Sequence, residues 1–283
     1  MENRRIQLIA LDLDGTLLNG NGEISEEDQK AICEASEKGI YIVVSTGRPY
    51  VGVPVEKLAP LGVRYAITTN GAAVYRVPEK ECLYSDSLER GLACRLIREL
   101  SRYDVHFDVF IDGEAYSQRD RQHLVDKLTF PEATKRYVKR TRKVEEDLAR
   151  FIEEKQAEVQ KITVNFYPLG DGTYKDRDKV FQLFSACPQI TFLSGGFHNL
   201  ELTRTGVEKG IGLRFLADML GISIEQTMAC GDTQNDLNIM QTAGVGVAME
   251  NAEDEVKAIA DFVTRSNDDS GVAFAIRQFM GER

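Results

Sequence analysis

The 283-residue sequence predicts an α/β fold in which a doubly wound parallel sheet is interrupted by an α+β insertion. Two stretches, one at each end of the chain, alternate short apolar runs with longer amphipathic ones, the order typical of parallel βα units. The middle of the chain, roughly residues 85–194, is more charged and does not keep this order. We therefore expect a discontinuous core formed by residues 1–84 and 195–283, and an inserted domain formed by residues 85–194.

The first part of the core opens with the run 6–11, which is apolar except for one glutamine, as expected of a strand buried on both faces. Ser25, with Asp28 three residues later, is a capping-box variant that predicts a helix. The runs 40–44 and 66–69 predict two further strands of the same sheet.

The second part of the core repeats this order. An apolar stripe predicts a helix over about 208–220, and a strand follows at 227–230. A helix from about Asp236, a strand at 245–248 and a helix capped by Asn251 complete the pattern. Within the insertion we expect strands at 105–111 and 162–167 and helices at about 88–103 and 144–156.

Composition excludes several classes of function. A net charge of −10 argues against general nucleic-acid binding, and five scattered cysteines without a CxxC spacing argue for free thiols and against zinc. No apolar run approaches the roughly 20 residues that span a membrane, and no signal-peptide pattern opens the chain, so we expect a cytoplasmic protein. Nothing in the sequence predicts a particular oligomeric state.

Two carboxylates follow the first predicted strand in the segment Leu11-Asp12-Leu13-Asp14-Gly15-Thr16. The carboxyl end of a parallel strand is where α/β sheets bind ligands, and a spacing of two in extended chain directs Asp12 and Asp14 to the same side. Gly15 lets the chain turn and bring backbone N–H groups close to an anion. We expect the backbone of Leu13 among these phosphate contacts.

Other polar groups follow the later strands. The segment Ser45-Thr46-Gly47-Arg48-Pro49 offers a hydroxyl and a glycine amide that could bind a phosphate oxygen. The same residue types are also common in ordinary turns. Lys209 opens a predicted helix, where a lone lysine is commonly solvated. The segment Asp232-Thr233-Gln234-Asn235-Asp236 gathers oxygen ligands without histidine or cysteine, the set that suits a hard cation such as Mg²⁺. Together these groups supply what phosphoryl transfer requires.

The four segments, in this order, resemble the motifs of the haloacid dehalogenase superfamily, and the insertion is similar to the type IIB cap of its Cof-type branch, in particular of YidA-like sugar phosphatases. Further matching segments extend almost from end to end: Thr69-Asn70-Gly71-Ala72, Val207-Glu208-Lys209-Gly210, Gly244-Val245-Gly246-Val247-Ala248-Met249, and Gly271-Val272-Ala273. The resemblance implies a Rossmann-like core, a mobile cap that closes over the site, and Mg²⁺ as cofactor.

The resemblance also implies a role for each matching residue. Asp12 matches the nucleophile that forms an aspartyl-phosphate, and Asp14 matches the general acid/base, whose backbone carbonyl also binds Mg²⁺. Thr46, Gly47, Lys209 and Asn235 match phosphate contacts. Asp232 matches a metal carboxylate, and Asp236 matches either a metal ligand or a residue that supports one.

We expect a small phosphorylated metabolite, in particular a sugar phosphate, as substrate. Candidate contacts to its leaving group are Arg48, Asn70, Ser194, His198 and Asn199, with Gly195-Gly196 as a hinge. A phosphomutase that uses the same intermediate, a non-enzymatic sugar-phosphate sensor and a phospho-acceptor like response-regulator receivers are alternatives. The nine residues 135–143 include six basic ones, which either steer anionic substrates or, the favoured interpretation, form a solvated surface.

Overall fold

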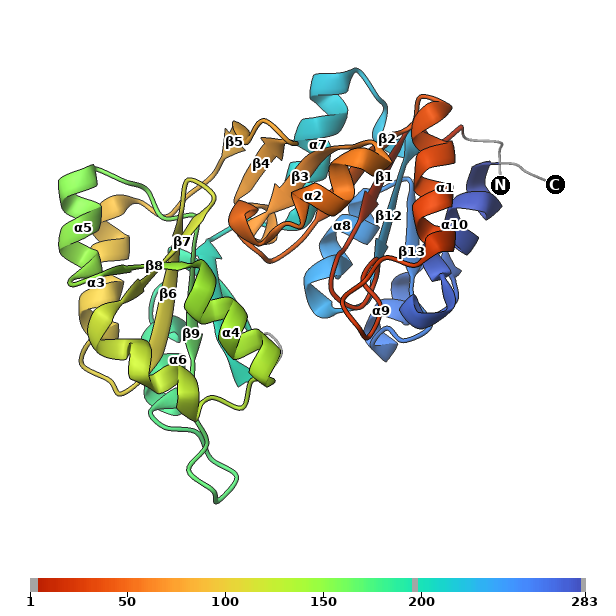
Figure 1. The fold of residues 1–283 in the computed structure, drawn as a ribbon. Coiled ribbons are helices and arrows are strands. Elements are labelled where there is room, and N and C mark those ends of the chain that lie inside the picture. Colours follow the sequence, from red (N-terminus) through yellow and green to blue (C-terminus); the bar gives the residue numbers. More distant parts are fainter. Residues whose placement is uncertain (1–4, 195–197, 281–283) are drawn as a thin grey trace. The chain divides into compact units, whose positions relative to one another are not determined.

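The computed structural model describes residues 5–194 and 198–280 (Figure 1). The chain divides into two compact units, a core made of the chain up to Tyr84 and from Glu208 onward, and an inserted domain, Ser85–Val207. Among the described residues, no helix has both the length and the apolar character that a membrane span requires.

An eight-stranded sheet runs through the described part of the core in the order β14-β13-β12-β1-β2-β3-β4-β5. The central strands pair in parallel from β14 to β3, and β4 pairs antiparallel with β3. The strands are β1 (Leu8–Leu11), β2 (Tyr41–Ser45), β3 (Val63–Thr68), β4 (Ala73–Arg76), β5 (Glu81–Ser85), β12 (Thr227–Gly231), β13 (Val245–Ala248) and β14 (Phe262–Val263). The doubly wound sheet that the sequence predicts is confirmed.

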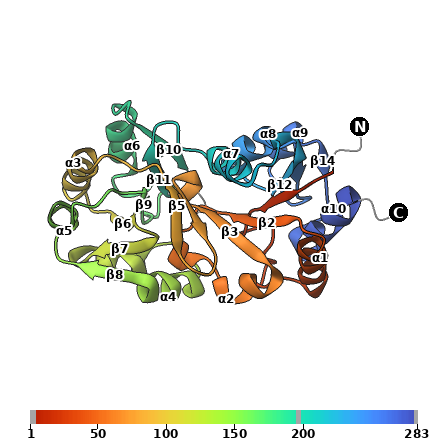
Figure 2. The ribbon, with the colours of Figure 1, turned by 90° about the horizontal axis from the view of Figure 1, so that it is seen from above.

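Helices cover both faces of this sheet. They are α1 (Glu26–Glu37), α2 (Val55–Leu58), α7 (Lys209–Leu220), α8 (Leu237–Thr242), α9 (Asp254–Ile259) and α10 (Gly271–Met280). Figure 2 shows α7, α8 and α9 on one face and α1 and α10 on the other. As predicted, the Ser25 hydroxyl caps α1 by accepting a hydrogen bond of 3.1 Å from the Asp28 amide. All four residues of β1 are buried, as its apolar sequence requires.

The inserted domain has its own sheet, in the order β10-β11-β9-β6-β7-β8. Its strands are β6 (His106–Ile111), β7 (Glu114–Gln118), β8 (Arg142–Glu145), β9 (Lys161–Asn165), β10 (Ile190–Ser194) and β11 (Leu200–Arg204). Its helices are α3 (Arg90–Leu100), α4 (Glu132–Thr141), α5 (Leu148–Lys155) and α6 (Arg177–Ser185). Side chains of α3, α5 and α6 pack with one face of the sheet into a separate hydrophobic core.

The second boundary of the insertion differs from the prediction. The expected boundary after residue 194 falls between β10 and β11, but β11 pairs with both β10 and β9 and therefore completes the sheet of the inserted domain. The boundary lies at Val207 instead. Sequence alone missed it because the residues after Ser194 look like a linker, while the partner strands of β11 are distant in sequence.

One local prediction is also wrong, and a second holds only in part. Asn251 does not cap a helix, since α9 begins at Asp254, and its side chain instead donates a hydrogen bond of 2.8 Å to the Gly15 carbonyl. The basic segment 135–143 is not uniformly solvated. Arg142 is buried against the sheet and donates a hydrogen bond of 2.9 Å to Asp108.

Candidate active site

Three adjacent strands bring polar side chains to the carboxyl edge of the core sheet. Asp12 directly follows β1, and its amide donates a hydrogen bond of 3.0 Å to the carbonyl of Cys230 in β12. Strand β1 lies between β12 and β2 in the sheet. Asp232 directly follows β12 and Thr46 directly follows β2, so both lie next to Asp12 at the same edge. Parallel pairing therefore gathers segments that are more than 200 residues apart in the sequence.

Lys209 lies at the centre of this group. Its side chain is fully buried, and its Nζ donates hydrogen bonds of 2.7 Å to Asp12 Oδ1 and 2.7 Å to Asp236 Oδ1. A third hydrogen bond of 3.1 Å reaches Asn235 Oδ1. Lys209 is therefore not a solvated lysine at a helix start, because all three of its donors point to residues that the sequence predicts for the site.

A close backbone approach holds Lys209 in place. Gly71, in the short helix after β3, has a φ of +100°, and a Cβ at this position would lie 2.2 Å from the carbonyl oxygen of Glu208. The preceding residues bind the loop after β2, with the Thr69 amide donating to the Arg48 carbonyl at 2.9 Å. Only glycine allows this contact, so the start of α7 is packed directly against the loop that follows β3.

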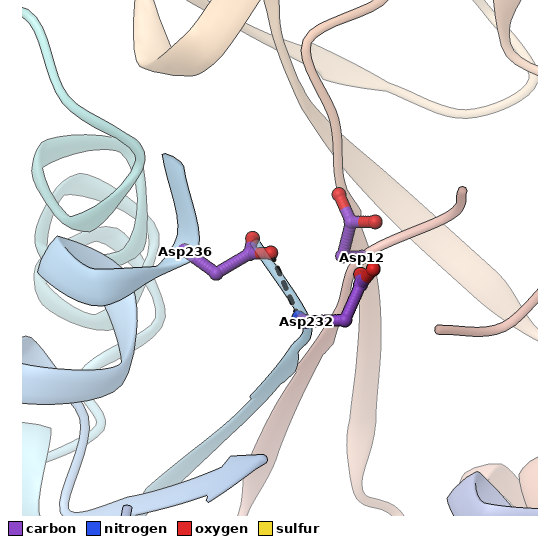
Figure 3. A group of neighbouring side chains, drawn as sticks. All are labelled: Asp12, Asp232 and Asp236. Carbon is purple, nitrogen blue, oxygen red and sulfur yellow. Dashed lines mark hydrogen bonds between the residues drawn. The ribbon is translucent and has the colours of Figure 1, made fainter. Parts of the chain in front are cut away.

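Three buried carboxylates, those of Asp12, Asp232 and Asp236, each offer an oxygen within 4.8 Å of the others (Figure 3). Asp232 Oδ1 accepts a hydrogen bond of 2.9 Å from the Thr16 hydroxyl. Asp236 Oδ2 accepts from the backbone amides of Asp232, at 3.0 Å, and Thr233, at 3.2 Å. Asp236 thus has both oxygens engaged, one by Lys209 and one by amides.

The charges in this group do not balance. Burial raises the pKa of Asp12 well above its usual range against the opposing attraction of Lys209, and the two neighbouring carboxylates raise it further. Burial, together with Asp236, raises the pKa of Asp232 to about 6. Burial lowers the pKa of Lys209, but Asp12 and Asp236 outweigh it and the net pKa is raised. One ammonium facing three buried carboxylates is an arrangement that a divalent hard cation fits.

Asp14 is not one of these three buried carboxylates. Its side chain is 60% exposed, and both of its oxygens accept hydrogen bonds from the Arg48 guanidinium, the Nε–Oδ2 distance being 2.8 Å. The strand ends at Leu11 and the chain turns after it, so the alternation of a strand does not extend over Asp12 and Asp14. Arg48, which we expected at the leaving group, here contacts the expected acid/base.

The other predicted residues of the core lie at the same edge. Leu13 is fully buried, and Thr46 is 2% exposed, with its hydroxyl accepting a hydrogen bond of 3.2 Å from the Arg48 amide. Gly47 lies between Thr46 and Arg48 in the chain. Asn70 has a φ of 59°, and its amide donates to the Thr46 carbonyl at 3.2 Å. Positive φ at a non-glycine residue marks backbone held by its surroundings, as at functional sites.

Ser194, His198 and Asn199 belong to the inserted domain. Ser194 ends β10, the His198 ring lies 4.6 Å from the Tyr174 ring between centroids, and Asn199 directly precedes β11. The hinge predicted at Gly195-Gly196 lies outside the described residues.

Sequence reasoning missed two groups that support the site. Thr16 fixes Asp232, and Asn251 fixes the carbonyl of Gly15 in the loop that carries Asp14. Gly15 itself has a φ of +86°, and a Cβ there would lie 2.3 Å from Asp232 Oδ2. Thr16 lies in the first motif that resembles the superfamily, so a signal was present there, but only the folded chain shows what Thr16 and Asn251 contact.

Comparison with known proteins identifies the family of this chain. Residues 9–276 match the family of haloacid dehalogenase-like hydrolases, and the chain belongs to this family. The phosphatase YwpJ of Bacillus subtilis is 32% identical over 97% of this chain and 100% of its own length. The 5-amino-6-(5-phospho-D-ribitylamino)uracil phosphatase YcsE of the same species is 29% identical over 99% and 98%.

Solved structures show the same fold. A haloacid dehalogenase-like hydrolase from B. subtilis superposes with a TM-score of 0.79 at 30% identity, covering 96% of this chain and 99% of that one. The resemblance that the sequence motifs indicated is therefore confirmed, and the chain is an enzyme of the hydrolase class that this family defines.

Proposed function

We propose that this protein is a Mg²⁺-dependent phosphatase that hydrolyses small phosphorylated sugars or polyols through an aspartyl-phosphate on Asp12. The observation that carries the proposal is the buried Asp12 carboxylate at the sheet edge, with one oxygen held by Lys209 at 2.7 Å. A carboxylate fixed in this way presents its remaining oxygen to a phosphorus atom in a defined direction. The phosphatase names of the relatives support the same reaction.

In the first step a carboxylate oxygen of Asp12 forms a bond to phosphorus while the bond from phosphorus to the ester oxygen breaks. Asp14 gives a proton to the departing alkoxide. In the second step Asp14 takes a proton from water, the water oxygen bonds to phosphorus and the acyl-phosphate bond breaks, which returns Asp12 and releases phosphate. The Thr46–Gly47 segment holds the phosphate oxygens during both steps, together with Lys209, which exchanges one of its three present acceptors for a phosphate oxygen.

The carboxylate cluster fits a magnesium ion. We assign direct ligation to Asp12 and Asp232, with the backbone carbonyl of Asp14 added from the family resemblance. Asp236 acts as a support, because its two oxygens already accept hydrogen bonds from Lys209 and from two amides. When bound, Mg²⁺ offsets the repulsion between the Asp12 carboxylate and the phosphate dianion.

The substrate proposal rests on chemistry and on one relative. The name of YcsE describes hydrolysis of a phosphate ester on a ribityl chain, which is a polyol. The phosphate contacts assigned above are common to every phosphate monoester, so they favour broad specificity across leaving groups.

A kinetic panel tests the function. kcat/KM is measured for hexose, pentose and tetrose phosphates, ribitol 5-phosphate, nucleotides and a phosphopeptide, with Mg²⁺ and after chelation. We expect sugar and polyol phosphates to be the best substrates and chelation to remove activity. A nucleotide or phosphopeptide that exceeds every sugar phosphate by about a hundredfold, or about 2.7 kcal/mol, would contradict the substrate class. Single-turnover product analysis would identify a mutase by phosphate returned to sugar.

A further inference from the structure

The loop after β1, residues 12–20, carries Asp14 at its exposed turn. Leu13 and the run 16–18 are buried, whereas the Asp14 side chain is 60% exposed. The backbone turns at Gly15, which has a φ of +86°. Because glycine has no side chain to restrict its dihedral angles, the turn by itself does little to fix the direction of the neighbouring peptide groups. Contacts from outside the loop therefore determine how firmly Asp14 is held.

Two asparagines from the late part of the core bind backbone carbonyls of this loop. Asn251 Nδ2 donates a hydrogen bond of 2.8 Å to the Gly15 carbonyl. Asn267 Nδ2 donates one of 2.9 Å to the Leu18 carbonyl, and the Asn267 amide donates one of 3.0 Å to Asn251 Oδ1. The nitrogen and the oxygen of the Asn251 side chain are thus both engaged, which defines the orientation of its amide. We call Asn251 and Asn267 the asparagine pair.

The asparagine pair lies on backbone that is itself held by the core sheet. On one side of Asn251, the Met249 amide donates a hydrogen bond of 3.1 Å to the Gly231 carbonyl. On the other side, the Glu253 amide donates one of 3.0 Å to the Asp232 carbonyl. Strand β14, which precedes the second asparagine of the pair, is paired in parallel with β13. The pair therefore connects the loop after β1 to the sheet edge at which Asp232 lies.

These contacts suit a positioning role better than a stabilising one. The hydrogen bonds of Asn251 lie at the surface, where water competes for the same groups, so their net contribution to stability is small. Their geometric effect is larger, because a donor fixed in front of the Gly15 carbonyl restrains the rotation of this peptide group. Asp14 is joined directly to Gly15, so its side chain keeps one direction from the backbone.

We propose that the asparagine pair positions Asp14 for proton transfer in the proposed phosphatase reaction, on which this inference rests. Arg48 binds the Asp14 carboxylate, whereas the pair holds the backbone that carries it. A general acid must lie within hydrogen-bond reach of the departing oxygen, and a displacement of about 1 Å can lower the rate about a hundredfold. Loss of the pair should therefore slow the steps that need Asp14 and spare those that do not.

The test uses the ratio of kcat/KM for ribitol 5-phosphate to kcat/KM for p-nitrophenyl phosphate, whose leaving group departs without a proton, at saturating Mg²⁺. Asn251→Asp keeps the acceptor for the Asn267 amide but removes the donor to Gly15, and the ratio should fall about tenfold. The added carboxylate repels both phosphate dianions alike, so its charge does not change the ratio. The uncharged Asn251→Ala should give the same fall.

Asn267→Asp removes the donor to the Leu18 carbonyl, which lies further along the chain from Asp14, and the ratio should fall about threefold. The matched control is Asp268→Ala. It removes the acceptor of the Gly20 amide at 2.8 Å, a contact between the same two segments but beyond the buried run 16–18, and it should leave the ratio unchanged. In the asparagine variants the aspartyl-phosphate should also accumulate in rapid-quench experiments, because Asp14 activates the water of the second step.

A merely structural role would lower the thermal midpoint or reduce both substrates equally. An unchanged ratio in both Asn251→Ala and Asn267→Asp would therefore overturn the proposal and indicate that the pair only fastens the end of the chain. A fall of equal size in Asp268→Ala would also overturn it, because any loosening of the loop would then have the same effect. The proposed function fails separately, if Asp12→Asn still hydrolyses p-nitrophenyl phosphate.

Discussion

Each of the two units buries a group of polar side chains against its sheet, but the two groups are completed differently. In the core, Lys209 binds three partners, and Asp232 and Asp236 bind a hydroxyl and backbone amides. The side chains there are hydrogen-bonded, and what remains unbalanced is charge. In the inserted domain the charges pair with one another, while Thr163 Oγ1 and Asn165 Oδ1 lack a hydrogen-bond partner among the described residues.

The two groups of buried polar side chains therefore differ in the ligands that they favour. An excess of buried carboxylate charge in the core favours binding of a cation. The neutral side-chain oxygens of Thr163 and Asn165 in the inserted domain carry no such excess of charge. The two groups of polar side chains therefore differ in kind, and substitutions in each should have different consequences.

The largest effect is expected from Asp12→Asn. The amide is a poor nucleophile, so kcat should fall at least about a thousandfold. The fold should persist because Lys209 keeps its hydrogen bonds to Asp236 and Asn235. Asp218→Asn, an exposed change on α7, serves as the matched control. Activity above about a hundredth of wild type would refute the nucleophile assignment.

Asp14→Asn should separate substrates by their leaving groups. An alkyl phosphate needs a proton on its departing oxygen, whereas p-nitrophenolate departs without one, so the alkyl substrate should lose about a hundredfold more. The aspartyl-phosphate should also accumulate, which rapid-quench experiments can measure. Equal losses for both substrates, with no accumulation, would mean that Asp14 is not the acid/base.

Asp232→Ala should act on the metal. It removes one of the two proposed carboxylate ligands, so the Mg²⁺ concentration that gives half-maximal activity should rise at least about tenfold. Titration of activity with Mg²⁺ after chelation measures this shift, and Asp218→Asn is again the control. If the wild type stays fully active after chelation, the metal proposal is wrong.

The smallest expected effect is on the pH dependence of stability in the inserted domain. The pKa of His106 is lowered by burial, with Asp108 opposing and Arg142 reinforcing the shift. The unfolded chain therefore binds more protons than the folded one, and stability should fall as pH drops below about 6.5. Asp108, whose pKa is lowered by Arg142 and His106 against the effect of burial, loses its contribution only at lower pH.

Between pH 7.5 and 5.5 the thermal midpoint of wild type should fall by about 3 °C more than that of His106→Gln. Differential scanning calorimetry on the full chain measures both midpoints. His123→Gln, a change at an exposed histidine of the same unit, should follow wild type. A wild-type profile no steeper than that of His106→Gln would show that burial does not keep His106 neutral.

The sequence by itself determined the parallel sheet, because buried strands require continuous apolar runs and helices require their own period and caps, all of which are local. It also identified Asp12, Lys209, Asp232 and Asp236, since each lies where a strand ends or a helix begins. Their convergence could be predicted because parallel strands end at one edge.

Tertiary structure alone decided the rest. The place of β11 depended on pairing with β9, far away in sequence, so the boundary after residue 194 was wrong. The contact between Asp14 and Arg48 arose where the strand ends and alternation stops. The pairing of Arg142 with Asp108 depends on which strands are neighbours. The same holds for the oxygens of Thr163 and Asn165, which have no hydrogen-bond partner in the part of the chain that the structure describes. A sequence does not show whether a polar residue is exposed to solvent, hydrogen-bonded within the protein or available to a ligand, because that depends on contacts between distant segments.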